Sequence, residues 1–291
     1  MASNDGVVGV GVIHDIGYQR YAGPRLARRY VVTALYLHSL RTAFGLGRSA
    51  VAKIFPGIVV GLAFVVAVVL VAVRSRAGGV IPYTYLQFID GLGIPLVVFL
   101  AVIAPELVSR DLRSRVLPLY FSRPLRRSDY AVAKLAATIS AVWLLLAGPL
   151  LVIFLGGAFS RSRGASAVWR EFTDFLGGLG YAAITAVVLG SFAVPLASLA
   201  SRRAVAAVVV VVAFVATAPV IGVVNAVGGT TAQQLGPLVN PATLLTGLET
   251  WIYRDDKLDI GPYGPLYLLV AVALVAACVA ALVARYRKVT V

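Results

Sequence analysis

Cysteine and histidine are nearly missing from this 291-residue chain, which has one cysteine, Cys278, and two histidines, His14 and His38. A single cysteine excludes an intrachain disulfide. Neither histidine has a metal-ligand spacing to the cysteine or to the other histidine, and no GxxxxGK[ST] phosphate-binding loop occurs. We therefore expect no catalytic residue, no metal and no cofactor on this chain, and any ATP that drives it must bind another subunit.

Charged residues are also scarce: they make up 13% of the chain against 60% hydrophobic residues, and the mean hydropathy is +0.91. Soluble domains carry about 25% charged residues. Residues 54–73 contain no charge at all, and at ~1.5 Å per helical residue they cover the ~30 Å hydrocarbon core. The sequence predicts an all-α integral membrane protein with about six transmembrane helices, near 54–73, 85–108, 131–159, 175–200, 204–224 and 265–283.

A cleavable signal peptide is not expected, because residues 1–30 lack an apolar core of 7–15 residues. The first span would then serve as the signal anchor. We divide the chain into a cytoplasmic N-terminal segment, 1–53, and a six-span transmembrane domain, 54–291.

The centres of the predicted spans hold no ionisable side chain, since Asp90, Glu106 and Lys134 all fall near span ends. A charged group at the bilayer centre costs ~2.5–3.5 kcal/mol on insertion scales, so proteins keep one there for function. Proton-coupled and many ion-coupled carriers need such groups. Their lack disfavours a secondary carrier, although a carrier that uses backbone carbonyls stays an alternative.

The formal charge of +14 is distributed unevenly between the two faces that these spans define. One face carries 19 of the 26 Lys and Arg residues, the opposite face the other 7. Because positive residues mark the cytoplasmic side, both termini are predicted to be cytoplasmic. The basic face would attract anionic lipid, and nucleic acid is not an expected partner. With a composition rich in Ala, Val and Arg, typical of a GC-rich bacterium, we expect a multi-pass protein of the bacterial inner (cytoplasmic) membrane.

An N-terminal helix is predicted over residues 25–45, where Leu26, Tyr30, Leu37 and Phe44 recur at helical spacing among several arginines. The segment is too polar to span a membrane. It fits an amphipathic helix in the membrane interface with its arginines towards phosphate. The alternative is a soluble helix packed on a cytoplasmic protein.

Two segments interrupt the simple pattern. The span at 85–108 contains Pro95 and Pro105, either of which can kink or end a helix. The outer segment 225–264 contains Pro237, Asn240-Pro241 and Gly261-Pro262, with Gly264-Pro265 at its end, but much of it is apolar. It is predicted either to enter the bilayer as short re-entrant pieces shielded by other helices or to form an ordinary outer loop.

Small residues recur at four-residue spacing in two places, GIVVG at 57–61 and Ala182, Ala186 and Gly190. Such spacing permits close helix contact or dimerisation. In a chain this rich in Ala, Gly and Val the same spacing also arises by chance, so it does not by itself predict an interface.

The segment 104–134, APELVSRDLRSRVLPLYFSRPLRRSDYAVAK, joins spans two and three on the predicted cytoplasmic face. Val108, Leu112 and Val116 follow one another at four-residue steps and give a short helix with one apolar stripe, with arginines on its other sides. An exposed apolar stripe on a cytoplasmic loop indicates a docking surface for a protein partner. The alternative is a helix that lies on the lipid.

This segment resembles the ABC type-2 permease family, the membrane subunits of ATP-binding-cassette transporters. The residues that carry the resemblance are Glu106, Arg110-Asp111, Leu117, Ser122-Arg123-Pro124, Tyr130 and Lys134. The six spans, the N-terminal interfacial helix and Asn240-Pro241 in the outer segment are similar to the family pattern as well. The stretch 110–127 is richer in arginine than that pattern, which leaves lipid binding open for some of these residues.

The resemblance implies a cytoplasmic coupling helix between spans two and three that docks on an ABC ATP-binding subunit. It implies two copies of that subunit, which bind ATP and Mg, and a second permease subunit in a homodimer or heterodimer. The candidate ATPase-coupling contacts are Glu106, Arg110, Asp111, Arg113, Arg115 and Leu117.

The function expected from the residues and the resemblance together is that of a permease subunit of an ATP-driven exporter. The uncharged span interiors point to an apolar or amphipathic solute. A secondary carrier and a non-transporting scaffold or signalling subunit are the alternatives.

Overall fold

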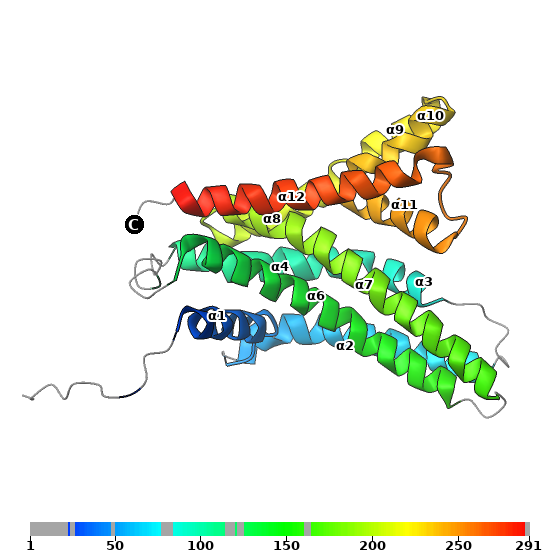
Figure 1. The fold of residues 1–291 in the computed structure, drawn as a ribbon, viewed down its shortest axis with the longest axis horizontal. Coiled ribbons are helices and arrows are strands. Elements are labelled where there is room, and N and C mark those ends of the chain that lie inside the picture. The colour runs from blue at the N-terminus through cyan, green and yellow to red at the C-terminus, as the bar shows by residue number, and fades with distance from the viewer. Residues whose placement is uncertain are drawn as a thin grey trace, which may run out of the picture.

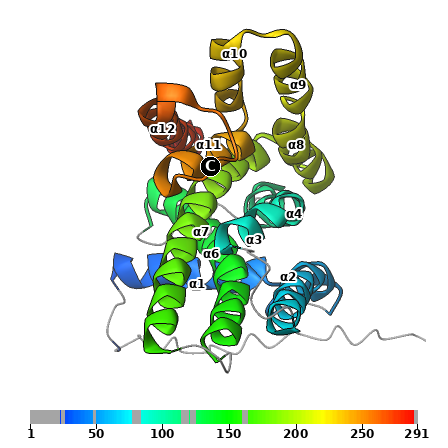
Figure 2. The ribbon, with the colours of Figure 1, turned by 90° about the vertical axis from the view of Figure 1, so that its right-hand side faces the viewer.

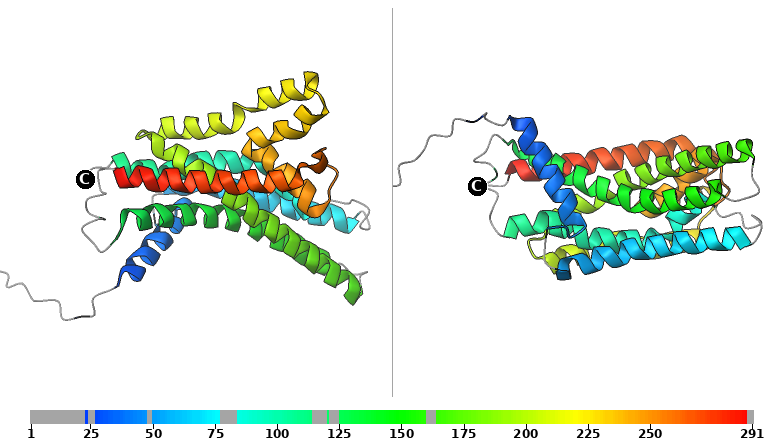
Figure 3. Two further views of the ribbon diagram at one scale, coloured as in Figure 1. Left: turned by 45° about the horizontal axis from the view of Figure 1, so that its top comes forward. Right: turned by 90° about the horizontal axis from the view of Figure 1, so that it is seen from below.

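The computed structural model describes residues 23, 27–47, 50–76, 84–113, 120, 125–159 and 164–288. Over these residues the chain is all-helical, without a strand, which confirms the predicted fold class at this level. Long helices run side by side along the longest axis of the molecule, and one short helix lies across them near one end (Figures 1 and 3). The helices are α1 Arg28–Ala43, α2 Ala50–Arg76, α3 Tyr85–Gly91, α4 Gly93–Arg113, α6 Arg127–Ala158, α7 Ala165–Leu199, α8 Arg203–Val215, α9 Ala218–Val227, α10 Thr230–Leu235, η1 Gly236–Val239, α11 Pro241–Tyr253, η2 Gly261–Tyr263 and α12 Gly264–Lys288.

Five stretches in the described part of the chain are long and apolar enough to cross a membrane: Ala52–Arg76, Arg127–Ala158, Ala165–Leu199, Arg203–Val227 and Gly261–Lys288. The bent pair α3 and α4 gives a sixth if it is counted as one span. The chain is thus a multi-pass membrane protein. The six predicted spans fall on these helices, but α7 begins at Ala165 and α4 continues to Arg113, so both helices extend further than the apolar runs from which they were predicted.

The second span is broken at Leu92, where the axes of α3 and α4 differ by 54°. Pro95 explains the position, because it has no N–H to bond the carbonyl of Gly91 four residues earlier and its ring crowds that carbonyl. The start of α3 is held by a capping box in which Thr84 and Gln87 bond each other's backbone N–H. Pro105 lies inside α4 without ending it.

The fifth span is also interrupted, which the sequence analysis did not predict. α8 ends at Val215 and α9 begins at Ala218, one residue before Pro219, whose missing N–H leaves the carbonyl of Val215 without its helical partner. The Asn240 side chain lies at this break: its Nδ2 donates to the carbonyl of Phe214, next to Val215, and to Thr217 Oγ1, both at 2.7 Å. Its Oδ1 accepts from the N–H of Ala242 and caps α11.

The predicted outer segment, 225–264, consists mainly of short helices and is not an extended loop. α9 and α10 project from the long helices, and η1 returns to the break in the fifth span at Asn240 (Figures 1 and 2). α11 then runs outward again, packed on α7 and α12. α8 has 13 residues, so Asn240 lies ~20 Å from the start of that span. This arrangement favours the re-entrant interpretation over an ordinary loop.

Replacing Asn240 with Ala should destabilise the protein by ~1–3 kcal/mol, because the change removes an N-cap and leaves a buried carbonyl unpaired. A lower midpoint of thermal unfolding in detergent, followed by tryptophan fluorescence, checks this. Asn225→Ala, at an exposed position of α9, is the control and should leave the midpoint unchanged. Equal midpoints for the two variants would contradict the role given to Asn240.

The N-terminal helix α1 crosses the bundle and packs on α6 and α4 (Figure 3). Its buried face is Leu35, Ser39 and Ala43, whereas Tyr30 and Leu37 of the predicted apolar stripe are exposed. The predicted helix is therefore present, and the bundle covers a side other than that of Tyr30 and Leu37, which belong to the stripe predicted to lie in the membrane interface. Ser39 and Ala43 are small, which lets α1 approach the bundle closely.

The two small-residue repeats differ in what they contact. On α7, Ala182 and Ala186 are fully buried, and a Cβ at Gly190 would meet Ile139 of α6 at 3.0 Å. Gly57 and Gly61 on α2 have nothing within 4 Å of such a Cβ. The α7 repeat therefore belongs to the α6–α7 contact at the centre of the bundle, and the α2 repeat faces away from the chain.

Candidate functional site

One end of the bundle carries most of the arginines, and we call it the inner end after the predicted topology, and the opposite end the outer end. Asp111, at the end of α4, holds the inner end together. Its Oδ2 accepts a hydrogen bond from the Tyr130 hydroxyl at 2.5 Å and lies 2.9 Å from Lys134 Nζ. Tyr130 and Lys134 are four residues apart on α6, so they present one face to α4. Because Lys134 is only 4% exposed, Asp111 supplies the negative charge that this buried ammonium requires.

Glu106 lies one and a half turns earlier on α4 and connects it to the hairpin between α7 and α8. Its Oε2 is 2.9 Å from Arg203 Nη1, and the glutamate is 7% exposed. Near the same level, the Ser109 hydroxyl donates to the Ala197 carbonyl of α7. α4 is therefore tied to α6 on one side and to α7 and α8 on the other.

The first turn of α6 receives contacts from three further parts of the chain. Arg28 of α1 makes a two-point ion pair with Asp129, with distances of 2.5 and 2.6 Å. Arg127 Nη1 donates to the Arg287 carbonyl at the end of α12. The Tyr130 ring packs against those of Tyr120 and Tyr286, at 5.7 and 5.2 Å between centroids. We call Glu106, Asp111, Asp129, Tyr130, Lys134 and Arg203 the inner cluster.

The six predicted coupling residues divide into two groups. Glu106 and Asp111 are described, and the carboxylate of each is engaged by residues of this chain. The side chains of Arg110 and Arg113 lie outside the description, as do Arg115, Leu117 and most of the predicted coupling helix, 114–119. The predicted amphipathic helix starts inside α4, since α4 continues without a break from Val108 to Arg113.

The sequence pattern placed Tyr130 and Lys134 in a motif without a role for either, and Arg203 was only one of the 19 basic residues of the predicted cytoplasmic face. The i, i+4 spacing of Tyr130 and Lys134 was the available signal for a shared partner. No local pattern could pair Glu106 with Arg203, because these residues lie on different helices about a hundred positions apart.

A second polar cluster lies at the opposite, outer end. Lys257, in the loop after α11, is within 4.0 Å of carboxylate oxygens of Asp90, Glu249 and Asp255. The Tyr181 hydroxyl also donates to Asp90, at 3.0 Å. Nearby, Glu171 accepts from the Tyr85 hydroxyl and pairs with Arg74. Three carboxylates around one ammonium give the Lys257 group a formal charge of −2 when all are ionised.

Glu249 is fully buried on α11, which is not one of the candidate spans. Burial raises the pKa of its carboxyl to about 7, although the hydrogen bond from Lys257 acts to lower it. Burial disfavours the charged form of Lys257, but its hydrogen bonds to Asp90 and Glu249 outweigh this and raise its pKa. The cluster therefore gains negative charge as the pH rises through about 7.

The described ion pairs join residues that the charge distribution had placed on the same face. The Arg28, Lys134 and Arg203 pairs unite inner residues, and the Arg74 and Lys257 pairs unite outer ones. If the number of membrane crossings had been predicted wrongly, some of these ion pairs would have joined residues assigned to opposite faces. The predicted division of the charged residues between two faces is thus consistent with the fold.

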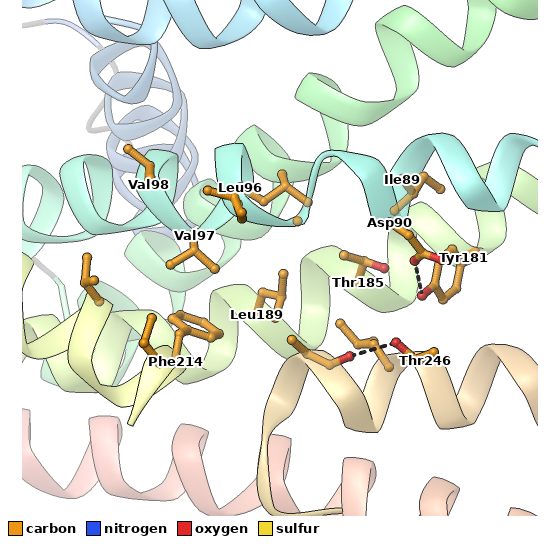
Figure 4. Close-up of a pocket in the computed structure, with 16 residues that line it drawn as sticks. Ile89, Asp90, Leu96, Val97, Val98, Tyr181, Thr185, Leu189, Phe214 and Thr246 are labelled. Carbon is orange, nitrogen blue, oxygen red and sulfur yellow. Dashed lines mark hydrogen bonds between the residues drawn. The ribbon is translucent and has the colours of Figure 1, made fainter. Parts of the chain in front are cut away.

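A pocket of about 420 Å³ lies next to the bend between α3 and α4, lined also by α7, α8 and α11. Figure 4 shows Asp90 and Tyr181 joined at one end of it, with Leu96, Leu189 and Phe214 further in. A second groove, of about 470 Å³, is almost wholly apolar and lies between α7, α11 and α12.

No protein-family model and no curated protein matches this chain.

Proposed function

We propose that this chain is the permease subunit of an ATP-driven transporter of the ABC type-2 kind, and that it exports an apolar or amphipathic solute. In this proposal it pairs with a second permease subunit and receives two ATP-binding subunits, which hold ATP and Mg. It is a protein of the bacterial inner membrane with both termini in the cytoplasm, with α1 at the interface and anionic lipid against the basic face.

The observation that carries the proposal is the double contact of Asp111 with Tyr130 and Lys134. It clamps the end of α4 to the start of α6, on the two sides of the segment that resembles a coupling helix. A displacement of that segment would therefore move α4 and α6 together. The ion pair of Glu106 with Arg203 would transmit the movement to α8. Such rigid-body transmission suits a subunit driven from outside.

The proposal gives the six coupling residues different roles. Glu106 and Asp111 are occupied within the chain, so we assign to them the positioning of the segment. The contacts with the ATP-binding subunit then fall to Arg110, Arg113, Arg115 and Leu117. Arginines there can form charge-assisted hydrogen bonds with acidic residues of a partner.

Purification of the full chain from its native membranes tests the proposal directly. We expect a P-loop ATPase to copurify and its ATP turnover to change by several-fold when the chain is bound. Gradient-driven transport by liposomes that hold this chain alone would favour a secondary carrier instead. A bound ATPase without any solute movement would favour a scaffold or signalling subunit.

The proposed orientation predicts which residues an impermeant maleimide can reach in intact cells. In a Cys278→Ala background, Asp256→Cys should react from outside, and Ser201→Cys, in the turn between α7 and α8, should react only after the cells are permeabilised. Both positions are exposed, so the label reports the face of the membrane and not burial. Labelling of Ser201→Cys in intact cells would reverse the topology and remove the proposed cytoplasmic coupling segment.

A further inference from the structure

The pocket beside the α3–α4 bend has the form of a small-molecule site. Its volume of about 420 Å³ lies within the ~300–1,000 Å³ range of ligand pockets, and its walls are mostly apolar. The wall residues come from α3, α4, α7, α8 and α11, so no single helix forms it. The bend next to Pro95 separates α3 from the line of α4 and makes room for the pocket (Figure 4).

The polar end of the pocket is negative. Asp90 lines it and shares Lys257 with Glu249 and Asp255, so one ammonium faces three carboxylates. Tyr181, also in the lining, donates its hydroxyl hydrogen to Asp90. A ligand group at this end would therefore meet uncompensated negative charge, which attracts a cation and repels an anion.

Thr185 gives an independent indication of a ligand. This residue is 3% exposed and lines the pocket, and within the described part of the chain its Oγ1 has no hydrogen-bond partner. Figure 4 shows the oxygen directed towards the Asp90 and Tyr181 end. Buried hydroxyl groups are normally paired, because an unpaired one loses its bonds to water without compensation. A donor supplied by a ligand would remove that deficit.

We propose that this pocket binds an amphipathic ammonium ion. Its N–H groups donate to Asp90 and Thr185, and its apolar body lies among Leu96, Leu189 and Phe214. Asp90 is at the outer end of the second span, so the head points to the outer surface and the tail to the middle of the membrane. That this ion is also the transported solute rests on the proposed function, whereas its binding does not.

Equilibrium dialysis of radiolabelled decylamine, which is protonated at pH 7.5, against lipid nanodiscs that hold the full chain tests the site. Empty nanodiscs measure partition into lipid. We expect saturable binding with one site per chain, and weaker binding of decyltrimethylammonium, which has the charge but no donor. Decanoate, with a similar tail and the opposite charge, should show no saturable component.

Three variants locate the binding. Val98→Trp, at the partly exposed wall of the pocket, should abolish it. Asp90→Asn should weaken decylamine binding by roughly tenfold or more, and Thr185→Val by roughly tenfold. Because Thr185→Val also removes an unpaired buried hydroxyl, it should raise the thermal midpoint while it weakens binding. A variant that merely damaged the fold would lower both.

The matched control is Ala276→Trp, which adds a similar bulk to the apolar groove between α7, α11 and α12. It should bind decylamine as the unchanged chain does. Equal binding by the Val98→Trp and Ala276→Trp variants, or decanoate binding as tight as that of decylamine, would overturn the inference. All of these measurements use the chain without an ATPase. Failure to copurify an ATPase would therefore contradict the proposed function but not the binding of an ammonium ion in this pocket.

Discussion

Asp111→Asn is expected to lower solute transport per ATP hydrolysed by at least tenfold while the ATP-binding subunit still assembles with the chain. The change removes the countercharge of Lys134, which is nearly fully buried. Breaking a buried ion pair from one side costs ~3–5 kcal/mol, because the remaining charge is left uncompensated. The strain falls at the junction of α4 and α6, where the proposed coupling segment begins and ends.

A loss of stability must be separated from a loss of coupling in this experiment. The double variant Asp111→Asn with Lys134→Met removes both charges and should recover most of the thermal midpoint, as neutral replacements of buried pairs often do. Coupling should stay low in the double variant, because no ion pair holds α4 to α6. Asp256→Asn, an exposed aspartate at the outer end, is the control for loss of one negative charge.

The outcome decides between two roles for Asp111. If the double variant regains both stability and coupling, Asp111 serves only the fold, and the proposed transmission through the α4–α6 clamp is wrong. If the single variant transports normally with an intact ATPase complex, the clamp has no function in coupling.

Lys257→Met should produce the largest loss of stability at the outer end. It leaves Glu249, which is fully buried, without its ion-pair partner, and such a loss costs ~3–5 kcal/mol where the carboxyl is ionised. Asp255→Asn is the control, since this residue approaches Lys257 only to 3.6 Å and is 38% exposed. Its midpoint should stay close to that of the unchanged chain.

The effect of Lys257→Met should depend on pH with a definite sign. Burial raises the pKa of Glu249 to about 7 from a usual value of 4.5. A carboxyl whose pKa is raised by folding favours the folded state most below its unfolded pKa, and this contribution is lost as the pH rises through the folded pKa. The ion pair with Lys257 exists only where the Glu249 carboxyl is ionised. The midpoint of thermal unfolding of the variant, followed by tryptophan fluorescence, should therefore be closest to that of the unchanged chain near pH 5 and furthest below it near pH 8. A constant difference across this range would show that Glu249 does not ionise there.

Several features of the fold followed from local patterns. The uncharged blocks located the spans because a bilayer tolerates little else over ~30 Å. Pro95 predicted an interruption in the second span, since a missing N–H acts on the turn before it whatever the surroundings are. The ion pairs of the inner cluster and of the Lys257 group agree with the faces assigned from the arginine distribution.

Other features were out of reach of local patterns. The side of α1 that packs on the bundle, Leu35, Ser39 and Ala43, could not be assigned from the apolar spacing, because burial depends on where α6 and α4 pass. The candidate coupling residues Glu106 and Asp111 were found by resemblance, but their partners Arg203 and Lys134 could not be assigned without the helix packing. The sequence drew attention to Asn240 because a proline follows it, but it gave no indication that the Asn240 side chain bonds the carbonyl of Phe214.

The sequence alone determined that the chain is helical, crosses the membrane several times and keeps its arginines mainly on one face, because hydropathy and charge act residue by residue against the bilayer. Only the tertiary structure decided which charged residues form ion pairs, that Asn240 bonds the backbone at the break in the fifth span, and where a pocket with one polar end forms. Those outcomes depend on distances between helices far apart along the chain, and no periodicity within one helix encodes them.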